Sequence, residues 1–212
     1  MSSILIELQY LPSLEYFCAL LIADDVVIES YEHYEKQSFR NRTNILTANG
    51  VSSLSIPIRG GNKKILSSKI EIDYNQKWKN NHWRAIQSAY GKAPYFEFYA
   101  DYFNRIYKTK PGTLFEFNKE LLSICLKLLQ LDIKIRYTTV YEKVPSGGLI
   151  DLRSVIHPKK TNNLNGIYAE MPYLQVFGNE FVPNMSIVDL LFCEGPNACN
   201  ILEQSALNFL NI

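Results

Sequence analysis

Apolar and polar positions over the first 30 residues follow two different periods. An apolar run at residues 4–8 reaches Tyr10-Leu11-Pro12-Ser13, which breaks the strand period and offers Ser13 as a helix cap. Apolar residues then recur at spacings of three and four to about residue 23, and residues 25–29 resume as a strand. A β-α-β unit needs parallel strands and a right-handed crossover, so an α/β layered sheet is expected.

Turn residues divide the next part of the chain. Asn49-Gly50 lies between runs at 43–47 and 52–58, which predicts a hairpin. The basic segment 59–64 has two glycines but lacks the spacing of a P-loop, so a solvated turn is favoured over a phosphate cradle. Residues 69–73 alternate as a half-exposed strand would.

The middle of the chain has the period of helices. Three are expected, over residues 77–90, from Pro94 onward, and over 113–131. Thr113 and Glu116 have the spacing of a capping box at the start of the third. Residues 133–140 then return to the character of a strand.

The pattern weakens between residues 142 and 172, where Gly, Asn, Pro and Ser are frequent. A loop of this length in a compact domain is usually functional or mobile, so a mobile loop region is expected here. A short strand at 173–177 and two helices, the last ending near 209, would complete the chain. These elements predict a single domain over residues 1–212, an α/β fold with a mostly parallel Rossmann-like sheet and an α-rich central insertion.

Composition narrows the classes of function. The chain has 212 residues, 47% of them hydrophobic, and a formal net charge of +1, which argues against a disordered tail and makes nucleic acid an unlikely partner. The four cysteines form no CxxC pair, which indicates reduced thiols and a cytoplasmic protein. Neither a signal peptide nor a membrane span is expected, because no apolar run approaches about 20 residues.

The first candidate site is the segment 31–42, which follows the second strand, at the sheet edge where open α/β sheets bind ligands. Its cations Lys36, Arg40 and Arg42 suit a phosphate or carboxylate, and His33 suits proton transfer near neutral pH. The alternative is a solvated edge whose basic side chains oppose aggregation. The candidate substrate-binding residues in this region and the first turn are Gln9, Tyr10, Tyr34, Lys36, Gln37, Arg40, Asn41 and Arg42.

A second cluster lies on the predicted helix at 77–90. His82 follows Trp78 by four residues and so shares its helix face, which makes His82 a candidate acid or base and Trp83 a candidate wall for a base or sugar ring. Aromatic residues at helical spacing more often form core, and core packing is the favoured alternative.

A third cluster, residues 151–153 with 157–160, could form a basic lid over an anionic ligand or an ordinary surface loop. No segment has the spacing of a metal site, so no metal is expected, and the cofactor is unknown.

Four stretches together resemble the WbqC-like protein family of bacteria. They are LQYLPSLEYF at 8–17, ADDVVIESYEHYEKQSFRNR at 23–42, NHWRAIQSAYGKAPYFEFY at 81–99 and FVPNMSIVDLLFCEGP at 181–196. The family is associated with O-antigen and other cell-envelope polysaccharide gene clusters. The resemblance implies a role in lipopolysaccharide-type biosynthesis, with group transfer on a nucleotide-linked sugar or similar small anionic substrate. The alternative is a non-catalytic module that binds a sugar, a nucleotide or a protein.

The first turn departs from the family pattern. Many members begin QPxYLPWxGYF, whereas Gln9 is followed here directly by Tyr10-Leu11-Pro12. This turn also looks like a degenerate entry to the adenylyl-transferring nucleotidyltransferase fold, in which a histidine pair opens the first helix. The chain has no histidine there, so the resemblance implies a transferase of that fold type without its usual histidine pair.

Overall fold

A parallel sheet forms one end of the fold in the computed structural model, which describes residues 3–60, 64–159 and 166–206. Its strand order is β5-β2-β1-β6, and each neighbouring pair is parallel. The bounds are β1 Ser3–Glu7, β2 Asp25–Glu29, β5 Ile135–Tyr137 and β6 Ile150–Asp151. The expected α/β class and parallel sheet are therefore confirmed, while the Rossmann-like arrangement stays a prediction.

The first crossover has the predicted β-α-β form. Helix α1, Leu14–Leu21, links β1 to β2, which pair from Ser3↔Asp25 to Glu7↔Glu29. Side chains alternate between the two faces of a strand. Ile4 and Ile28 join the main core under the helices, whereas Leu5 and Val27 line the opposite face. The two faces of the sheet are thus covered by different parts of the chain.

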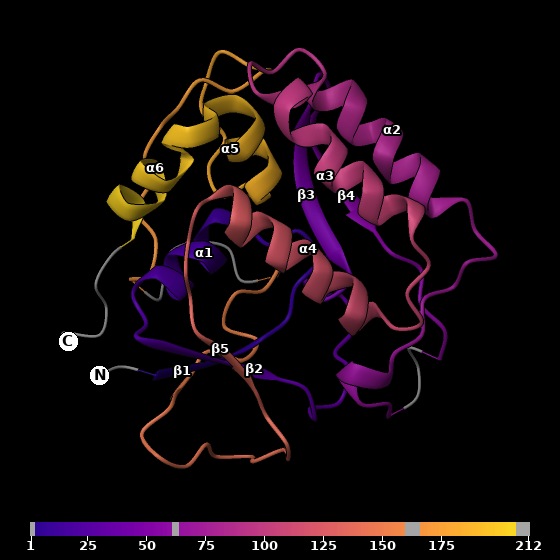
Figure 1. Ribbon diagram of the computed structural model, residues 1–212, viewed down its shortest axis with the longest axis vertical. Helices are drawn as coiled ribbons and strands as arrows, with labels where there is room; N and C mark the ends of the chain where they lie inside the picture. The colour runs from indigo at the N-terminus through magenta and orange to yellow at the C-terminus, as the bar shows by residue number, and fades with distance from the viewer. Residues whose placement is uncertain (1–2, 61–63, 160–165, 207–212) are drawn as a thin grey trace.

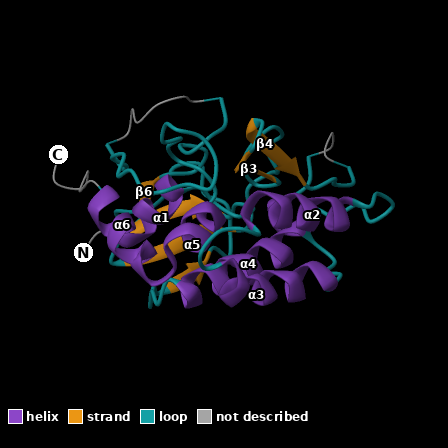
Figure 2. Ribbon diagram, turned by 90° about the horizontal axis from the view of Figure 1, so that it is seen from above, coloured by secondary structure: helices purple, strands orange, loops and turns teal. Residues whose placement is uncertain are grey.

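The predicted hairpin is present and separate from the main sheet. Strands β3, Arg42–Thr47, and β4, Gly50–Ser55, pair antiparallel across Asn49-Gly50, where Gly50 has φ of 91°. A positive φ of this size favours glycine, which explains the turn sequence. Figure 2 shows the hairpin beside α2 and apart from the parallel sheet.

Helices cover one side of the molecule (Figure 1). Three helices form the α-rich middle that was predicted, and two pack together near the end of the described chain. Their bounds are α2 Trp78–Tyr90, α3 Phe96–Lys108, α4 Leu114–Leu128, α5 Ile187–Glu194 and α6 Ala198–Ser205, with short 3₁₀ helices η1 Ser67–Lys69 and η2 Gly195–Asn197. In the described ranges, none of these helices is long and apolar enough to span a membrane.

Three strand predictions need correction. Residues 69–73 do not form a strand, because Glu71 and Ile72 make only isolated bridges, to Thr113 and Ile58. Residues 173–177 also lie outside any strand, and β6 falls within the region expected to be loop. A strand is defined by its partner, which a short alternating run does not specify. The predicted end of the last helix, residues 207–209, lies outside the described residues.

The capping box at the start of α4 is confirmed and provides a test. Thr113 Oγ1 accepts from the Glu116 backbone N–H at 3.2 Å, and Glu116 Oε2 accepts from the Thr113 N–H at 3.1 Å. Thr113→Ala should therefore lower the free energy of unfolding by about 1 kcal/mol. Urea denaturation measures the change, with the exposed Thr139→Ala for comparison. Unchanged stability in Thr113→Ala would show that the box contributes little.

Candidate functional site

Two glutamates end neighbouring strands at the carboxyl edge of the sheet. Glu7 closes β1 and Glu29 closes β2, and the two residues are in register. Both are only 1% exposed. Carboxylates are rarely buried unless they are paired, so this edge of the sheet must supply compensating donors.

Both carboxylates are held by several donors. Glu7 accepts from Gln9 Nε2 at 2.7 Å and from the Ser154 backbone N–H at 2.8 Å. Glu29 Oε1 accepts from the Tyr31 N–H and from Thr138 Oγ1, each at 2.8 Å. These contacts tie the ends of β1 and β2 to the segments that follow β5 and β6.

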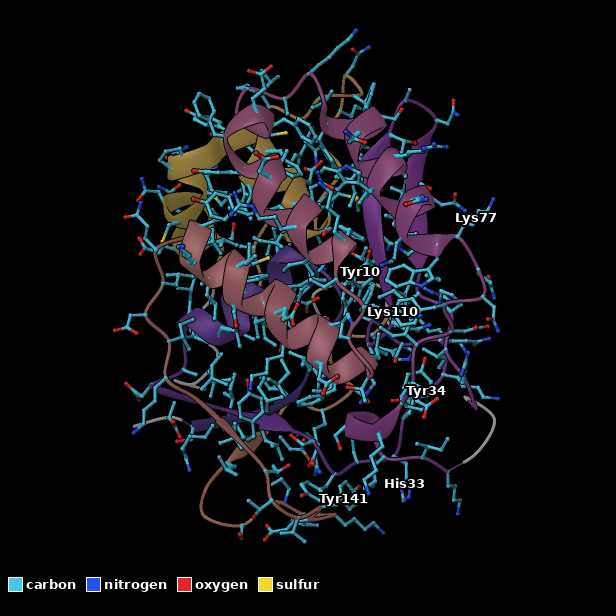
Figure 3. The ribbon with its side chains drawn as sticks, turned by 45° about the vertical axis from the view of Figure 1, so that its right-hand side comes forward. Tyr10, His33, Tyr34, Lys77, Lys110 and Tyr141 are labelled. Carbon is cyan, nitrogen blue, oxygen red and sulfur yellow. The ribbon has the colours of Figure 1, made fainter. Side chains whose placement is uncertain are left out.

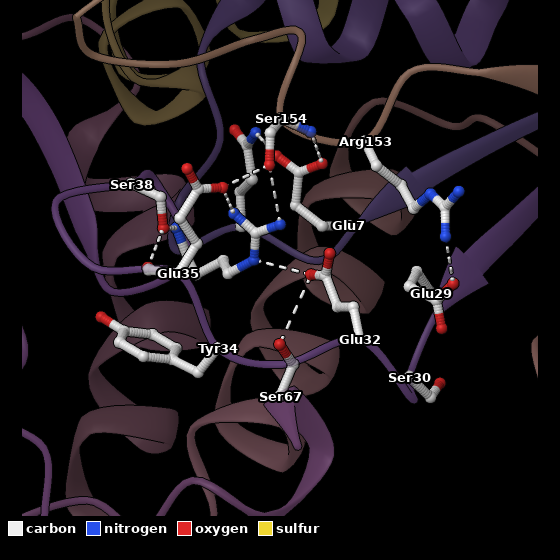
Figure 4. A network of polar contacts seen from close by, with 12 residues as sticks. Glu7, Glu29, Ser30, Glu32, Tyr34, Glu35, Ser38, Ser67, Arg153 and Ser154 are labelled. Atoms are coloured by element: carbon white, nitrogen blue, oxygen red, sulfur yellow. Dashed lines mark hydrogen bonds and ion pairs between the residues drawn. The ribbon is translucent and has the colours of Figure 1, made fainter. Parts of the chain in front are cut away.

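The network of polar contacts in Figure 4 includes Glu32, Glu35 and Ser154. Arg40, which is 2% exposed, contacts all three of these residues. Its Nε donates to Glu32 at 2.7 Å, its Nη1 to Glu35 at 3.4 Å and its Nη2 to Ser154 Oγ at 3.1 Å. Burial by itself lowers the pKa of Arg40, but Glu7, Glu32 and Glu35 outweigh it and raise the pKa well above its ordinary value. Arg40 therefore stays charged and fully engaged by protein groups.

The free-energy cost of burying this network falls mainly on the Glu32 carboxylate. Burial raises the pKa of Glu32, and the hydrogen bond from Arg40 only partly offsets the rise. Buried ion pairs add little net stability, because desolvation consumes most of the attraction. A network of this kind is therefore better explained by a functional site than by the needs of folding.

The strand order places the network where an α/β sheet binds ligands. From β1 the chain moves to β2 and β5 on one side, and then returns to β6 on the other side of β1. Ligands of open α/β sheets bind outside the carboxyl ends of the strands at such a reversal. Gln9 follows β1 and Ser154 follows β6, so both lie at this point.

A pocket of about 410 Å³ adjoins the network on the sheet face opposite α1. Leu5 and Val27 supply apolar surface, and Glu29 lines the pocket from the strand end. The segment 138–149 covers this side and hangs below the strands in Figure 1. The lining also includes hydroxyl-bearing and charged residues, namely Ser3, Arg136, Tyr137, Thr138, Thr139, Glu142 and Ser146.

Arg153 fastens this covering segment to the network. Its side chain is largely buried, and its Nη1 donates to Glu29 Oε2 at 3.0 Å and to the Glu142 carbonyl at 2.9 Å. Its Nη2 donates to the Lys143 carbonyl at 3.3 Å, and its guanidinium lies 5.1 Å from the centre of the Tyr141 ring. One side chain thus fixes both the buried carboxylate and the loop that closes the pocket.

The structure does not bring the predicted site residues of the segment 31–42 together in one place. Of the first-turn and segment residues, Gln9 and Arg40 lie in the network. Tyr34 lies beside the network in Figure 4, and its Oη donates to Asn41 Oδ1 at 2.8 Å. His33, Lys36 and Gln37 are exposed, and Arg42 begins β3.

Tyr10 and His82 meet in the aromatic core instead. Tyr10 Oη lies 2.9 Å from His82 Nδ1 and also contacts Tyr107 Oη. Burial lowers the pKa of His82 to about 4, and a hydrogen bond with the Ser55 backbone partly opposes it, so the ring is neutral at pH 7. Figure 3 shows Tyr10 inside the molecule and His33 at its lower edge. His82 therefore lies among aromatic side chains and is not part of the charged network.

Trp83 also belongs to an aromatic cluster. Its ring stacks on Phe96 at 6.3 Å and lies 5.8 Å from the Tyr107 ring, measured between centroids. His157 lies nearer the network, with its Nε2 3.9 Å from a Glu35 carboxylate oxygen. Of the three histidines, His157 is thus the one beside the charged groups.

Sequence reasoning missed the glutamates and Asn118. Glu7 and Glu29 each end an apolar run, and this repeated pattern was the available signal. Asn118 lies on α4, where its Nδ2 donates to the Arg40 carbonyl at 2.7 Å, and only the packing of α4 reveals it. Within the described ranges, no group of three His, Cys, Asp or Glu side chains could hold a metal ion.

The fold and the site together define an α/β protein with a small parallel sheet and a buried charged site at its carboxyl edge. Comparison with known proteins gives the family. The chain belongs to the WbqC-like protein family, which matches residues 9–157 and 158–201.

A curated relative is similar over nearly its whole length. The uncharacterized protein Rv1507c of Mycobacterium tuberculosis (strain ATCC 25618 / H37Rv) is 25% identical over 223 residues, which cover 93% of this chain and 96% of the relative. No solved structure matches the chain significantly. The family resemblance predicted from the four sequence stretches is confirmed.

Proposed function

We propose that the chain is an enzyme of cell-envelope polysaccharide biosynthesis that transfers a group on a nucleotide-linked sugar or similar substrate. The sugar ring would bind in the pocket beneath the sheet, against Glu29. Family membership supports the biological setting, and the placement of Glu29 supports the site. The buried carboxylate that lines this pocket is the observation that carries the proposal.

Glu29 has capacity for one more donor. A carboxylate offers about four acceptor positions. In the described contacts three are taken, two on Oε1 and one on Oε2 by Arg153. A sugar hydroxyl could donate to the remaining position on Oε2.

The pocket lining suits a sugar ring. Leu5 and Val27 offer an apolar surface for the C–H face of the ring, while Thr139 and Ser146 offer hydroxyls to its rim. Pockets that combine apolar surface with a few placed polar groups are typical of small-molecule sites.

The chemistry would follow from Glu29. As a sugar hydroxyl oxygen attacks the group carried by an activated donor, the hydroxyl proton would pass to the Glu29 carboxylate, which acts as general base. The bond between the group and its donor would break in the same step, and the donor would leave as an anion. Arg153, Gln9 and Arg40 would act as positioning residues, because each holds a carboxylate of the network in place. This arrangement needs no histidine at the reacting atoms.

Replacing Glu29 tests the proposal. Glu29→Gln keeps the shape but removes the charge, and it should weaken nucleotide-sugar binding about tenfold, as expected for one hydrogen bond to a charged group. Saturation-transfer NMR and calorimetry against a panel of nucleotide sugars would measure it. Glu97→Gln, on the exposed face of α3, makes the same chemical change far from the pocket and should bind normally.

Turnover separates the two classes of function. An enzyme should convert a bound nucleotide sugar into a product that chromatography resolves, and Glu29→Gln should abolish this. Saturable binding without product would favour the non-catalytic module. Equal binding by Glu29→Gln and the parent protein would contradict the proposed site.

A further inference from the structure

A second groove lies away from the pocket beneath the sheet. It has a volume of about 540 Å³ and is lined by residues 68–75 and 110–113 together with Arg59. It therefore runs from η1 to the start of α4. Lys69 and Lys110 line it, and both are exposed.

Two ammonium groups lie close to the ring of Tyr74, which lines the groove. Lys110 also lines the groove, whereas Lys79 lies beside it and donates from Nζ to the Thr109 carbonyl at 2.7 Å. Lys79 Nζ lies 5.4 Å and Lys110 Nζ 5.2 Å from the centre of the Tyr74 ring, with Lys110 on the side that Figure 3 brings forward. Burial and the charge of Lys110 lower the pKa of Lys79. The like charges thus repel each other, and an added anion would relieve the repulsion.

Three acidic side chains near the groove have other partners. The Arg59 guanidinium lies 3.9 Å from Glu71 and 3.7 Å from Asp73, and Glu116 accepts from the backbone at the start of α4. In the described part of the chain, no carboxylate lies within ion-pair distance of the three lysines in this region, Lys69, Lys79 and Lys110.

We propose that this groove is a binding site for a phosphate-bearing ligand, with Lys69, Lys79 and Lys110 contacting a diphosphate group. Among the charged residues that line the groove, Arg59, Lys69 and Lys110 outnumber Glu71, and an excess of positive charge in a cleft concentrates anions. Lysine serves as a point-charge partner for phosphate, and hydrogen bonds between ionised groups are about twice as strong as neutral ones. This site stands whether or not the chain acts on a sugar at Glu29.

Calorimetric titration with inorganic pyrophosphate tests the site. The parent protein should bind it saturably, with affinity that falls as salt is added. Lys79→Gln/Lys110→Gln should weaken binding at least about tenfold, since each lysine makes a charge-assisted contact. Lys92→Gln/Lys127→Gln is the control for net charge, and it also removes a lysine that lies 5.5 Å from the centre of a tyrosine ring.

Comparison of the two double variants separates binding at this groove from a general effect of net charge or of misfolding. Circular dichroism should show both double variants folded, and the control should bind pyrophosphate within about twofold of the parent. The inference is overturned if the parent does not bind, or if both double variants lose affinity equally. Glu29→Gln should bind pyrophosphate normally, so failure of the pocket proposal would leave this result unchanged.

Discussion

Replacing Arg40 with methionine should lower the free energy of unfolding at pH 7 by about 3 to 5 kcal/mol, the usual effect of breaking a buried ion pair. Methionine fills a similar volume but leaves the Glu32 carboxylate buried without its 2.7 Å partner. Glu35 is half exposed and would be solvated, so Glu32 bears most of the loss. Guanidinium denaturation of the purified variant measures the effect.

The loss of stability in Arg40→Met should depend on pH, and the pKa of Glu32 sets the direction of this dependence. The pKa of Glu32 is already raised in the folded protein, and loss of Arg40 should raise it further. A raised folded-state pKa means that the folded chain binds more protons than the unfolded chain. The stability deficit of the variant should therefore shrink as the pH falls from neutrality toward the ordinary pKa of glutamate.

A second substitution distinguishes the ion pair from a packing defect. Adding Glu32→Gln to Arg40→Met removes the unpaired charge and should recover much of the lost stability. A loss below about 1 kcal/mol in Arg40→Met, or no recovery in the double variant, would show that the pair does not govern stability at this edge.

Acidification should destabilise the protein through His82 by about 3 kcal/mol in total, because the pKa of this ring falls from its ordinary value near 6.5 to about 4. The unfolded chain takes up a proton below pH 6.5, whereas the folded chain does so only near pH 4. The free energy of unfolding therefore falls across this window as the pH is lowered.

His82→Asn isolates this contribution from other acid effects. The asparagine carbonyl can accept from Tyr10 Oη, which lies 2.9 Å from His82 Nδ1 in the parent. The variant should be less stable at pH 7, since it loses the ring contact with Trp78 at 5.2 Å between centroids. The stability difference from the parent should narrow between pH 6.5 and 4. A constant difference would mean that His82 is protonated as easily when folded as when unfolded.

Much of the fold could be predicted from local periodicity. The first β-α-β unit, the Asn49-Gly50 hairpin and the three central helices have clear period and turn signals, and all are present. The two-residue β6 and the run at 69–73 were wrongly assigned, since pairing with remote segments decides them. A local sequence pattern can predict an extended segment, but a strand also needs a segment to pair with.

The candidate site could be predicted only in part. Gln9 and Arg40 were identified from the density of polar groups near strand ends, and they do lie in the network. Ser154, which accepts from Arg40, is 114 residues distant from it in sequence, so no local signal could pair the two. For His82, helical spacing correctly predicted a position beside Trp78. Spacing alone could not show that the face these two residues share is buried.

The short outer strands of the parallel sheet affect how the chain behaves in concentrated solution. β5 has three residues and β6 has two, whereas the central strands each have five. A long exposed edge invites another chain to extend the sheet, and short edge strands are one way in which proteins prevent such aggregation. β1 and β2 pair with each other along their whole length, and the described edges of the sheet are strands of only two and three residues, which opposes edge-to-edge polymerisation.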